Sequence, residues 1–238
     1  MFNLSYDLHI HSCLSPCGDD DSTPSNIVGM AAIKGLDVIA LTDHNSCRNT
    51  PAAKKTADEY GVIFIPGMEL TTAEEVHVLC LFETVEAALD WDRFVYDRLI
   101  KIRNKAEIFG NQILYNESDE ITGYEENLMI NATTISFGEV YSLVHEYDGI
   151  MIPSHLEKSS TSLISNLGMI PEDSQFKTVE VNHLDKLHEL KRNHPYVNEC
   201  RIICDSDAHR LVDIREPELT IPVCEKTPEA VLDYLRGL

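Results

Sequence analysis

Short hydrophobic runs alternate with amphipathic stretches along the whole chain. The runs are rich in β-branched residues, and several are apolar at nearly every position, which is typical of strands covered on both faces. They cover residues 4–10, 37–41, 62–66, 77–82, 149–152, 178–181 and 201–204, with a weaker run at 219–223. Strands that alternate with helices predict βαβ units around a parallel sheet. Seven or eight such units in 238 residues favour a barrel over a doubly wound sheet.

The helices between the runs are marked by capping residues. Three Thr-Pro pairs place a capping hydroxyl before a proline, which is favoured at the first position of a helix. These pairs are Thr23-Pro24, Thr50-Pro51 and Thr227-Pro228. Ser136 and Glu139 have the spacing of a capping box. Thr84 opens a longer helix, which is predicted to run to about Lys105.

The chain has no repeat, low-complexity tract or linker. We therefore expect one α/β barrel domain over residues 1–238. Residues 108–134 have the least readable pattern and include the acidic stretches 116–120 and 123–127. They are expected to form an acidic loop or a small insertion over one end of the barrel.

Composition is that of an ordinary globular protein, with 43% hydrophobic and 25% charged residues. The 19 Lys and Arg residues against 40 Asp and Glu residues leave a net charge of −21. A field of this sign repels phosphate backbones and anionic membranes, so we expect neither stable nucleic-acid binding nor a membrane partner. No run approaches the roughly 18–20 apolar residues of a membrane span, and the first residues lack a secretory leader pattern. With seven cysteines interpreted as reduced thiols, this predicts a cytoplasmic protein.

Side chains that can ligate metal ions follow the hydrophobic runs, one after another. They are His9 and His11, Asp43 and His44, Glu69, His155, and Asp207 and His209. In a βα barrel the carboxyl ends of the strands share one mouth, so these groups would converge. Residues two apart in a strand point to the same side. His9 and His11 would therefore aim at one point, and Asp207 and His209 repeat that spacing.

So many ligands at one mouth predict more than one metal ion. Neutral imidazole and carboxylate suit zinc, manganese and iron. Two or three divalent ions with a bridging carboxylate would use the ligands and would offset the mutual repulsion of the acidic groups. Glu180 should also point into the barrel, either as a polar lining residue or with a role in function.

Quoted in chain order, these motifs resemble the PHP (polymerase and histidinol phosphatase) superfamily. The segments are Asp7-Leu8-His9-Ile10-His11-Ser12, Thr42-Asp43-His44-Asn45, Gly67-Met68-Glu69, His155 and Ser206-Asp207-Ala208-His209. The resemblance extends from about residue 4 to about residue 215 and keeps the motif order of the family. It implies a distorted (β/α)7 TIM-like barrel with a trinuclear metal centre that hydrolyses phosphoesters.

Carried over residue by residue, the resemblance implies three ligand sets. The first is His9, His11, Glu69 and Asp207, the second is Glu69 as a bridge with His77 and His155, and the third is His44 and His209. A further ligand of the third set is usually a His or Asp seven or eight residues after the first motif histidine, and position eight here is Cys17. The Cys17 thiolate would favour zinc, and Asp19 or Asp20 is the alternative ligand.

The resemblance predicts a metal-dependent phosphoesterase that hydrolyses a small phosphorylated metabolite or nucleotide by a hydroxide bridging two metal ions. Asp43 is expected to orient a ligand imidazole or a water. Arg48, Lys158 and Arg210 follow the histidine motifs closely in sequence and are the candidate contacts to the substrate phosphate. Several divalent ions would invert the field of an acidic chain locally, so an anionic substrate is not excluded.

Three other functions compete with this prediction. An exonuclease-type phosphodiesterase is disfavoured by the net charge of −21 and by the lack of a basic stripe with interleaved aromatic residues. A non-catalytic metal-binding regulatory module is disfavoured by the nearly complete ligand set, although Cys17 leaves it open. A metal-dependent amidohydrolase is expected to carry a lysine for a carbamylated bridge, whereas this chain offers Glu69.

Overall fold

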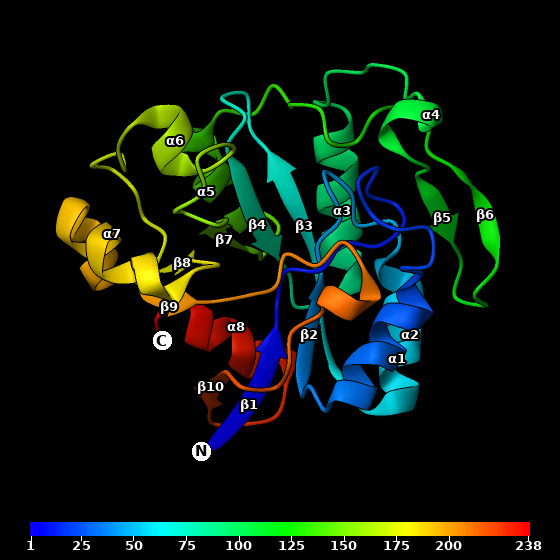
Figure 1. Cartoon of the computed structure of the whole chain (residues 1–238), viewed down its shortest axis with the longest axis horizontal. Helices are drawn as coiled ribbons and strands as arrows, with labels where there is room; N and C mark the ends of the chain where they lie inside the picture. Colours follow the sequence, from blue (N-terminus) through cyan, green and yellow to red (C-terminus); the bar gives the residue numbers. More distant parts are fainter.

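A curled, mixed sheet forms the centre of the computed structural model, which describes residues 1–238 (Figure 1). Its strands, in spatial order, are β10 (Thr220–Val223), β1 (Phe2–Asp7), β2 (Val38–Leu41), β3 (Ile63–Thr71), β4 (His77–Leu81) and β7 (Ile150–Pro153). Strands β1, β2 and β3 run parallel, whereas β4 is antiparallel to both of its neighbours and β10 is antiparallel to β1. A separate parallel pair is formed by β8 (Thr178–Glu180) and β9 (Arg201–Ile203). Each predicted run therefore contains a strand.

The expected α/β class is confirmed, but an exact (β/α)7 barrel is not present. Only five residues connect β3 to β4, which is too short for the crossover helix that a parallel pair requires, so the two strands form a hairpin. The β8–β9 pair meets β1 near the mouth through one isolated bridge, between Ile10 and Ala208. The carboxylate of Asp7 reinforces this junction, because it accepts hydrogen bonds from Ser206 N (3.0 Å) and Ser206 Oγ (2.6 Å).

Helices cover the sheet on several sides. They are α1 (Pro24–Lys34), α2 (Thr50–Tyr60), α3 (Val85–Tyr96), α4 (Ala106–Phe109), α5 (Phe137–His145), α6 (Leu163–Leu167), α7 (Leu187–Asn193) and α8 (Pro228–Arg236). The predicted caps at Thr23 and Thr227 are confirmed, as is the capping box of Ser136 with Glu139. None of the helices has the length and apolar character needed to span a membrane.

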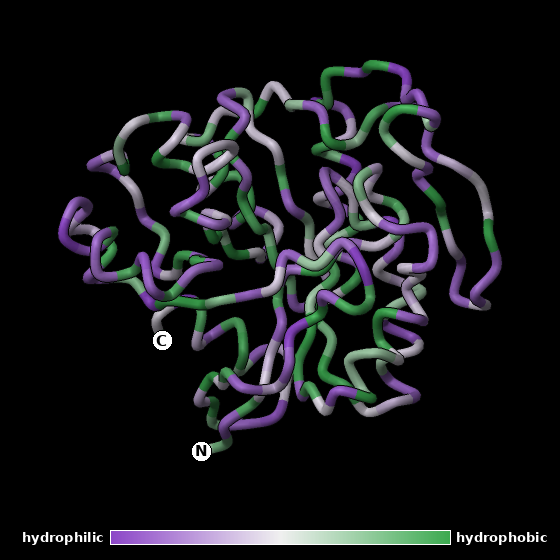
Figure 2. Tube along the Cα trace, viewed as in Figure 1, coloured by the Kyte–Doolittle hydropathy of each residue, from purple (hydrophilic) through white to green (hydrophobic).

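Buried apolar residues form three clusters around the sheet. The inner cluster packs strand residues such as Leu79 and Ile152 against Val231 and Leu235 of α8. The second lies around Trp91 of α3, and the third joins α1 and α2 to β2 and β3. Figure 2 shows mainly hydrophobic chain in the centre of the molecule and mainly hydrophilic chain along α7 at the left. The clusters fix the strands from three sides and leave polar side chains at one end of the sheet.

Helix α3 ends at Tyr96, so the predicted helix to Lys105 is wrong. Residues 98–104 are instead extended and pair antiparallel with residues 126–134. Their backbone groups bond to this returning chain, for example Ile100 N to Ala132 O (3.0 Å) and Leu128 N to Ile102 O (2.7 Å). Between the two lie α4 and the hairpin of β5 (Ile113–Tyr115) with β6 (Ile121–Tyr124). The insertion is therefore longer than residues 108–134, and regular structure replaces the expected loop.

Candidate metal centre

Four side chains converge on one point near the carboxyl ends of β1, β3 and β9. His9 Nε2 and His11 Nε2 are 3.0 Å apart. Each lies 3.3 to 3.4 Å from a carboxylate oxygen of Glu69 and from Asp207 Oδ1. Two atoms bound at 2.0–2.1 Å to one tetrahedral ion are about 3.3 Å apart. The spacing is therefore that of ligands around a single metal ion.

Second hydrogen bonds orient both imidazoles. His11 Nδ1 lies 3.0 Å from Ser15 Oγ, whose own proton goes to Asp43 Oδ1 (2.7 Å), so His11 Nδ1 donates and His11 Nε2 keeps its lone pair. His9 Nδ1 lies 2.9 Å from Glu180 Oε1. The Nε2 atom of His11 and the carboxylate oxygens of Glu69 and Asp207 therefore face one another as acceptors. A cation is the partner that such a set of buried acceptors requires, and the residues present fit a divalent metal ion.

Glu69 joins this group to a second one. Its Oε1 lies 3.1 Å from His77 Nδ1 and 3.1 Å from His155 Nε2, while its Oε2 lies 3.1 Å from His44 Nδ1. No hydrogen bond satisfies the buried Nδ1 atoms of His44 and His155. The donor atoms of His44, Glu69 and His77 lie within 4.8 Å of one another, which suits a metal site bridged by Glu69, whereas His155 is outside this set and approaches it at Glu69 Oε1.

The antiparallel hairpin explains how His77 reaches the centre. Because β4 runs opposite to β3, its first residue lies at the end where β3 finishes, and Thr71 pairs with His77. Glu69 and His77 are then diagonal neighbours on one face of the pair. If β4 ran parallel to β3, its first residue, His77, would lie at the opposite end of the sheet from Glu69.

A third set of nitrogens comes from His11, His44 and His209, whose donor atoms lie within 4.8 Å of one another. His209 Nδ1 lies 2.8 Å from its neighbour's backbone oxygen, Asp207 O, which leaves Nε2 free for a ligand. Cys17 belongs to none of the three sets and is exposed.

Asp19 and Asp20 are also outside the three sets. Asp19 Oδ1 accepts from Asp21 N (3.1 Å), and Asp20 Oδ2 accepts from Asn111 Nδ2 (2.8 Å). Asp19 meets the third set through its backbone, since Asp19 N donates to His209 O (2.9 Å), and not through its carboxylate. Imidazoles are therefore the donors that the structure brings to the third set.

Burial and charge polarise the centre strongly. Burial alone would raise the pKa values of Glu69 and Asp207, but neighbouring imidazoles, His9 among them, hold both well below their usual range. Burial lowers the pKa of His11, and it lowers that of His44 to about 4, so both imidazoles are neutral. His9 differs, because Glu180, Glu69 and Asp207 outweigh burial and raise its pKa. The ionised carboxylates of Glu69 and Asp207 therefore favour a cation at the middle of the site.

Glu180 is completely buried behind His9. Besides facing His9 Nδ1, it accepts a hydrogen bond from the backbone N of His155 (2.8 Å). One carboxylate therefore contacts the imidazole of His9 and holds the backbone of His155, which decides between the two roles that the sequence leaves open for Glu180. The useful signal was the alternation with Val179 and Val181, whose side chains enter an apolar core.

Glu180→Gln is expected to weaken metal binding by about 10- to 100-fold, because the amide keeps the shape but loses the charge that raises the basicity of His9. Competition with a chromophoric chelator measures the affinity. Glu172→Gln is the matched control, since Glu172 is an exposed carboxylate shortly before β8. Equal affinities in the two variants would show that Glu180 does not support the ligand.

Asp43 lies behind the ligands instead of among them. Its carboxylate accepts from Ser12 N (2.7 Å), Ser12 Oγ (2.6 Å) and Ser15 Oγ (2.7 Å). Ser15 Oγ in turn faces His11 and accepts from the backbone N of His44 (3.1 Å). Asp43 therefore contacts the imidazole of His11 through Ser15.

The three candidate phosphate contacts occupy different surroundings. Lys158 Nζ is bonded to Asp207 Oδ2, and this carboxylate outweighs burial to raise the lysine's pKa. Arg48 forms an ion pair with Glu125 (2.7 Å) in the insertion. Arg210 is exposed. Among the three, Lys158 is thus the cation joined directly to a ligand of the centre.

Three residues next to the centre have left-handed backbone conformations. The φ angles are 49° at Asn45, 30° at His155 and 54° at Asp207. Such conformations in residues other than glycine cost about 1–3 kcal/mol each and gather at functional sites. Here they turn the chain just beyond a strand so that His155 and Asp207 face the shared point.

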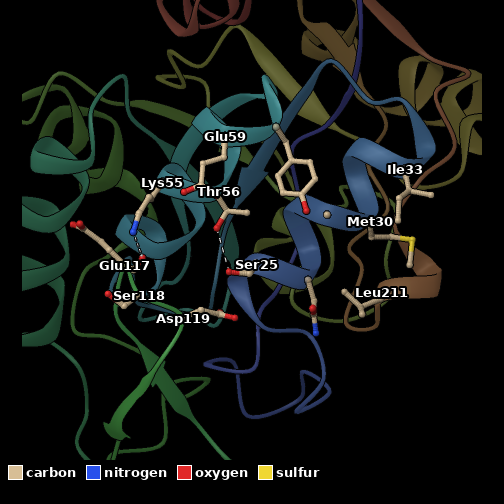
Figure 3. Close-up of a pocket in the computed structure, with 13 residues that line it drawn as sticks. Ser25, Met30, Ile33, Lys55, Thr56, Glu59, Glu117, Ser118, Asp119 and Leu211 are labelled. Carbon is tan, nitrogen blue, oxygen red and sulfur yellow. Dashed lines mark hydrogen bonds between the residues drawn. The ribbon is translucent and has the colours of Figure 1, made fainter.

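A hollow of about 580 Å³ lies elsewhere, between α1, α2 and the tip of the β5–β6 hairpin (Figure 3). Lys55 Nζ crosses it to donate to Glu117 O (2.8 Å), and Ser25 bonds to Thr56 through their hydroxyls (3.1 Å). None of its lining residues is a predicted site residue.

Solved structures with a similar fold include a nuclease and a phosphoesterase. The lesion-specific endonuclease PfuEndoQ from Pyrococcus furiosus matches with a TM-score of 0.69 and 19% identity, over 100% of this chain and 56% of that one. A putative metal-dependent phosphoesterase from Bifidobacterium adolescentis matches with a TM-score of 0.61 and 17% identity, over 98% of this chain and 96% of that one. At these identities the likeness concerns the fold.

A 5'-3' exoribonuclease from Haemophilus influenzae is 35% identical over 79 residues, which cover 32% of this chain and 28% of the relative. Matches to curated relatives cover between 7% and 56% of their own lengths.

These comparisons contradict the expectation of a small phosphorylated partner and no nucleic acid. The relative above is named as a nuclease of RNA, and endonuclease Q is also solved with a 27-mer duplex substrate. The expectation was wrong because it relied on charge summed over the whole chain. Contact with a phosphate depends on the local field, which metal ions and a few lysines or arginines can invert.

A model of the PHP domain matches residues 7–183, about three quarters of the chain. The match begins at the first ligand motif and includes Glu69, His77, His155 and Glu180. Members of this family that resemble the chain are phosphoesterases and nucleases by name, so the predicted hydrolase of phosphoester bonds is confirmed at the level of the family. The chain belongs to the PHP domain family.

Proposed function

We propose that this chain is a metal-dependent phosphodiesterase that hydrolyses a nucleic acid strand. The observation that carries the proposal is the convergence of His9, His11, Glu69 and Asp207 at ligand spacing. The nuclease names among the relatives support this substrate class over the small metabolite expected from the sequence.

The donor sets suit two or three divalent ions of zinc, manganese or iron. Such ions would supply an activated water at neutral pH and offset the charge of the phosphodiester. Glu69 would serve two ions at once, since its two oxygens face different imidazoles. Cys17, Asp19 and Asp20 are not needed in this arrangement.

The chain's own residues complete the site. Lys158 keeps its charge at neutral pH and, with Arg48 and Arg210, would contact phosphate oxygens that approach the mouth. Asp43 and Glu180 would hold His11 and His9 in the tautomers that leave Nε2 free for ligation. Both are buried, which keeps water from competing for these hydrogen bonds.

Hydrolysis of a labelled single-stranded oligonucleotide and of bis(p-nitrophenyl) phosphate, with added Mn²⁺ or Zn²⁺ and with chelator, tests the proposal. Metal-dependent cleavage of both substrates is expected. Hydrolysis of the small diester alone would refute the nucleic-acid substrate. No hydrolysis by a metal-replete protein would favour a non-catalytic metal-binding module.

A further inference from the structure

Residues 98–105, here called the basic segment, are unlike the rest of this acidic chain. They contain four of its 19 lysines and arginines and no aspartate or glutamate. The four are Arg98, Lys101, Arg103 and Lys105. The sequence predicts a helix here and no basic stripe, whereas the structure has an extended segment.

Backbone pairing places the basic segment at the rim of the metal centre. The segment pairs with residues 126–134, and Asn131 Nδ2 donates to Ile100 O (2.5 Å). Asn45, which directly follows His44, donates from Nδ2 to Met129 O (2.6 Å) and Asn131 O (2.8 Å). Two side-chain amides thus connect the segment to a ligand motif.

The continuation of the segment contacts the loop that contains Cys17. Helix α4 follows, and Gly110 at its end packs closely against the loop before Cys17. A Cβ atom added to Gly110 would lie only 2.3 Å from Pro16 O. Next to it, Asn111 bonds to Asp20 (2.8 Å). The insertion therefore contacts the rim at both the Asn45 side and the Cys17 side, while its β5–β6 hairpin projects away at the right of Figure 1.

Three of the four cations are accessible to solvent. Lys101, Arg103 and Lys105 are exposed, and none forms an ion pair. They occupy alternate positions of an extended segment, so they share one side at intervals of about 6.5 Å. Arg98 differs, because it donates to Phe94 O (3.0 Å) and lies over the Phe94 ring.

An aromatic ring contacts both Lys101 of this segment and Arg48, which follows the His44 motif. Lys101 Nζ is 4.6 Å and Arg48 Cζ is 5.3 Å from the centre of the Tyr96 ring. Tyr96 is fixed by hydrogen bonds, since Asn127 Nδ2 donates to its hydroxyl (2.7 Å), which donates to Glu125 Oε1 (3.1 Å). Positive charge and an aromatic ring beside it are the elements of a surface for single-stranded nucleic acid.

We propose that Lys101, Arg103 and Lys105 hold the sugar-phosphate backbone of a single-stranded nucleic acid whose scissile phosphate lies at the metal centre. The inference rests on the proposed function and names the surface that guides the strand. A single row of cations matches one backbone, which carries one charge per nucleotide, better than the two backbones of a duplex.

The test compares the triple variant Lys101→Ala/Arg103→Ala/Lys105→Ala with a charge-matched control. The control is Lys186→Ala/Lys191→Ala/Arg192→Ala, on or next to α7 at the other side of the molecule. Substrates are bis(p-nitrophenyl) phosphate, which is too small to reach the segment, a single strand of about 12 nucleotides, and a duplex of the same length. Both kcat and KM are measured over a range of salt concentrations.

For the single strand, KM of the triple variant should rise by about tenfold with kcat unchanged. The slope of log affinity against log salt should fall by about 2, since each lost phosphate contact removes about 0.7. Turnover of the small diester should stay at the wild-type level, and the control should behave as wild type. If the triple variant loses the small-diester activity through misfolding, Lys101→Gln/Lys105→Gln carries the same test.

The outcomes separate the two proposals. If the wild type cleaves the single strand and the variant has the same KM and salt slope, the inference is overturned while the proposed function stands. A change confined to the duplex overturns the single-strand assignment. If the wild type cleaves only the small diester, the proposed function fails, and the inference fails with it.

Discussion

Glu69→Gln is expected to lower phosphodiester hydrolysis by at least about 10³-fold. Glu69 Oε1 faces His9, His77 and His155, and Oε2 faces His11 and His44. An amide would replace one of these oxygens with an N–H group aimed at imidazole lone pairs. Losing the shared ligand removes several kcal/mol of charge stabilisation, and each 1.4 kcal/mol is about a factor of ten in rate.

Steady-state hydrolysis of bis(p-nitrophenyl) phosphate at saturating Mn²⁺ measures this loss. Glu75→Gln is the control, because Glu75 lies exposed in the turn of the same β3–β4 hairpin. The control should keep its activity. A Glu69→Gln protein with more than a tenth of the wild-type rate would show that the carboxylate is not shared between ions.

Removal of metal is expected to lower the melting temperature by about 10 °C. Saturating metal at about 1,000 times its dissociation constant stabilises the folded state by about 4 kcal/mol. In a domain of this size each kcal/mol shifts Tm by about 2–4 °C. Without metal, no bound ion offsets the charge of the buried carboxylates of Glu69 and Asp207. The closely spaced imidazoles of His9 and His11 also lack an ion between them.

Thermal unfolding with excess Zn²⁺ or Mn²⁺ and with chelator measures this shift. Glu69→Gln provides the internal comparison, since a protein with a damaged centre should respond less to chelator. A wild-type Tm that is the same with metal and with chelator would mean that bound metal does not stabilise the folded protein.

The sequence predicted the strands and the ligand motifs well, for a physical reason. Runs such as 37–41 and 149–152 are apolar because they are buried on both faces, and that requirement is local. His9 and His11 converge as their spacing predicted, although β1 ends at Asp7. Residues two apart point to the same side wherever the backbone is locally extended, even where it is not part of a regular strand.

Features that depend on pairing over long distances could not be predicted. The antiparallel β4 follows from a five-residue turn and places His77 in the centre, yet strand direction has no signature in the apolar run itself. Residues 98–105 contain helix-forming lysine and arginine, but their backbone pairs with residues 126–134. The basic character of the rim was missed for this reason.

Sequence reasoning also undervalued the residues behind the ligands. Ser15 is one of several serines in a polar loop, and nothing in the sequence distinguishes it. Only the fold brings it between Asp43 and His11. Glu180 is separated from His9 by 171 positions, so their contact depends on how the β8–β9 pair is placed relative to β1.

Metal content per chain, measured by inductively coupled plasma mass spectrometry after reconstitution with Zn²⁺ or Mn²⁺ and removal of free ions, tests the central claim most directly. The three donor sets predict two or three ions per wild-type chain and at most one in Glu69→Gln. A wild-type protein that retains fewer than one ion per chain, or as many ions as the variant, would contradict the account.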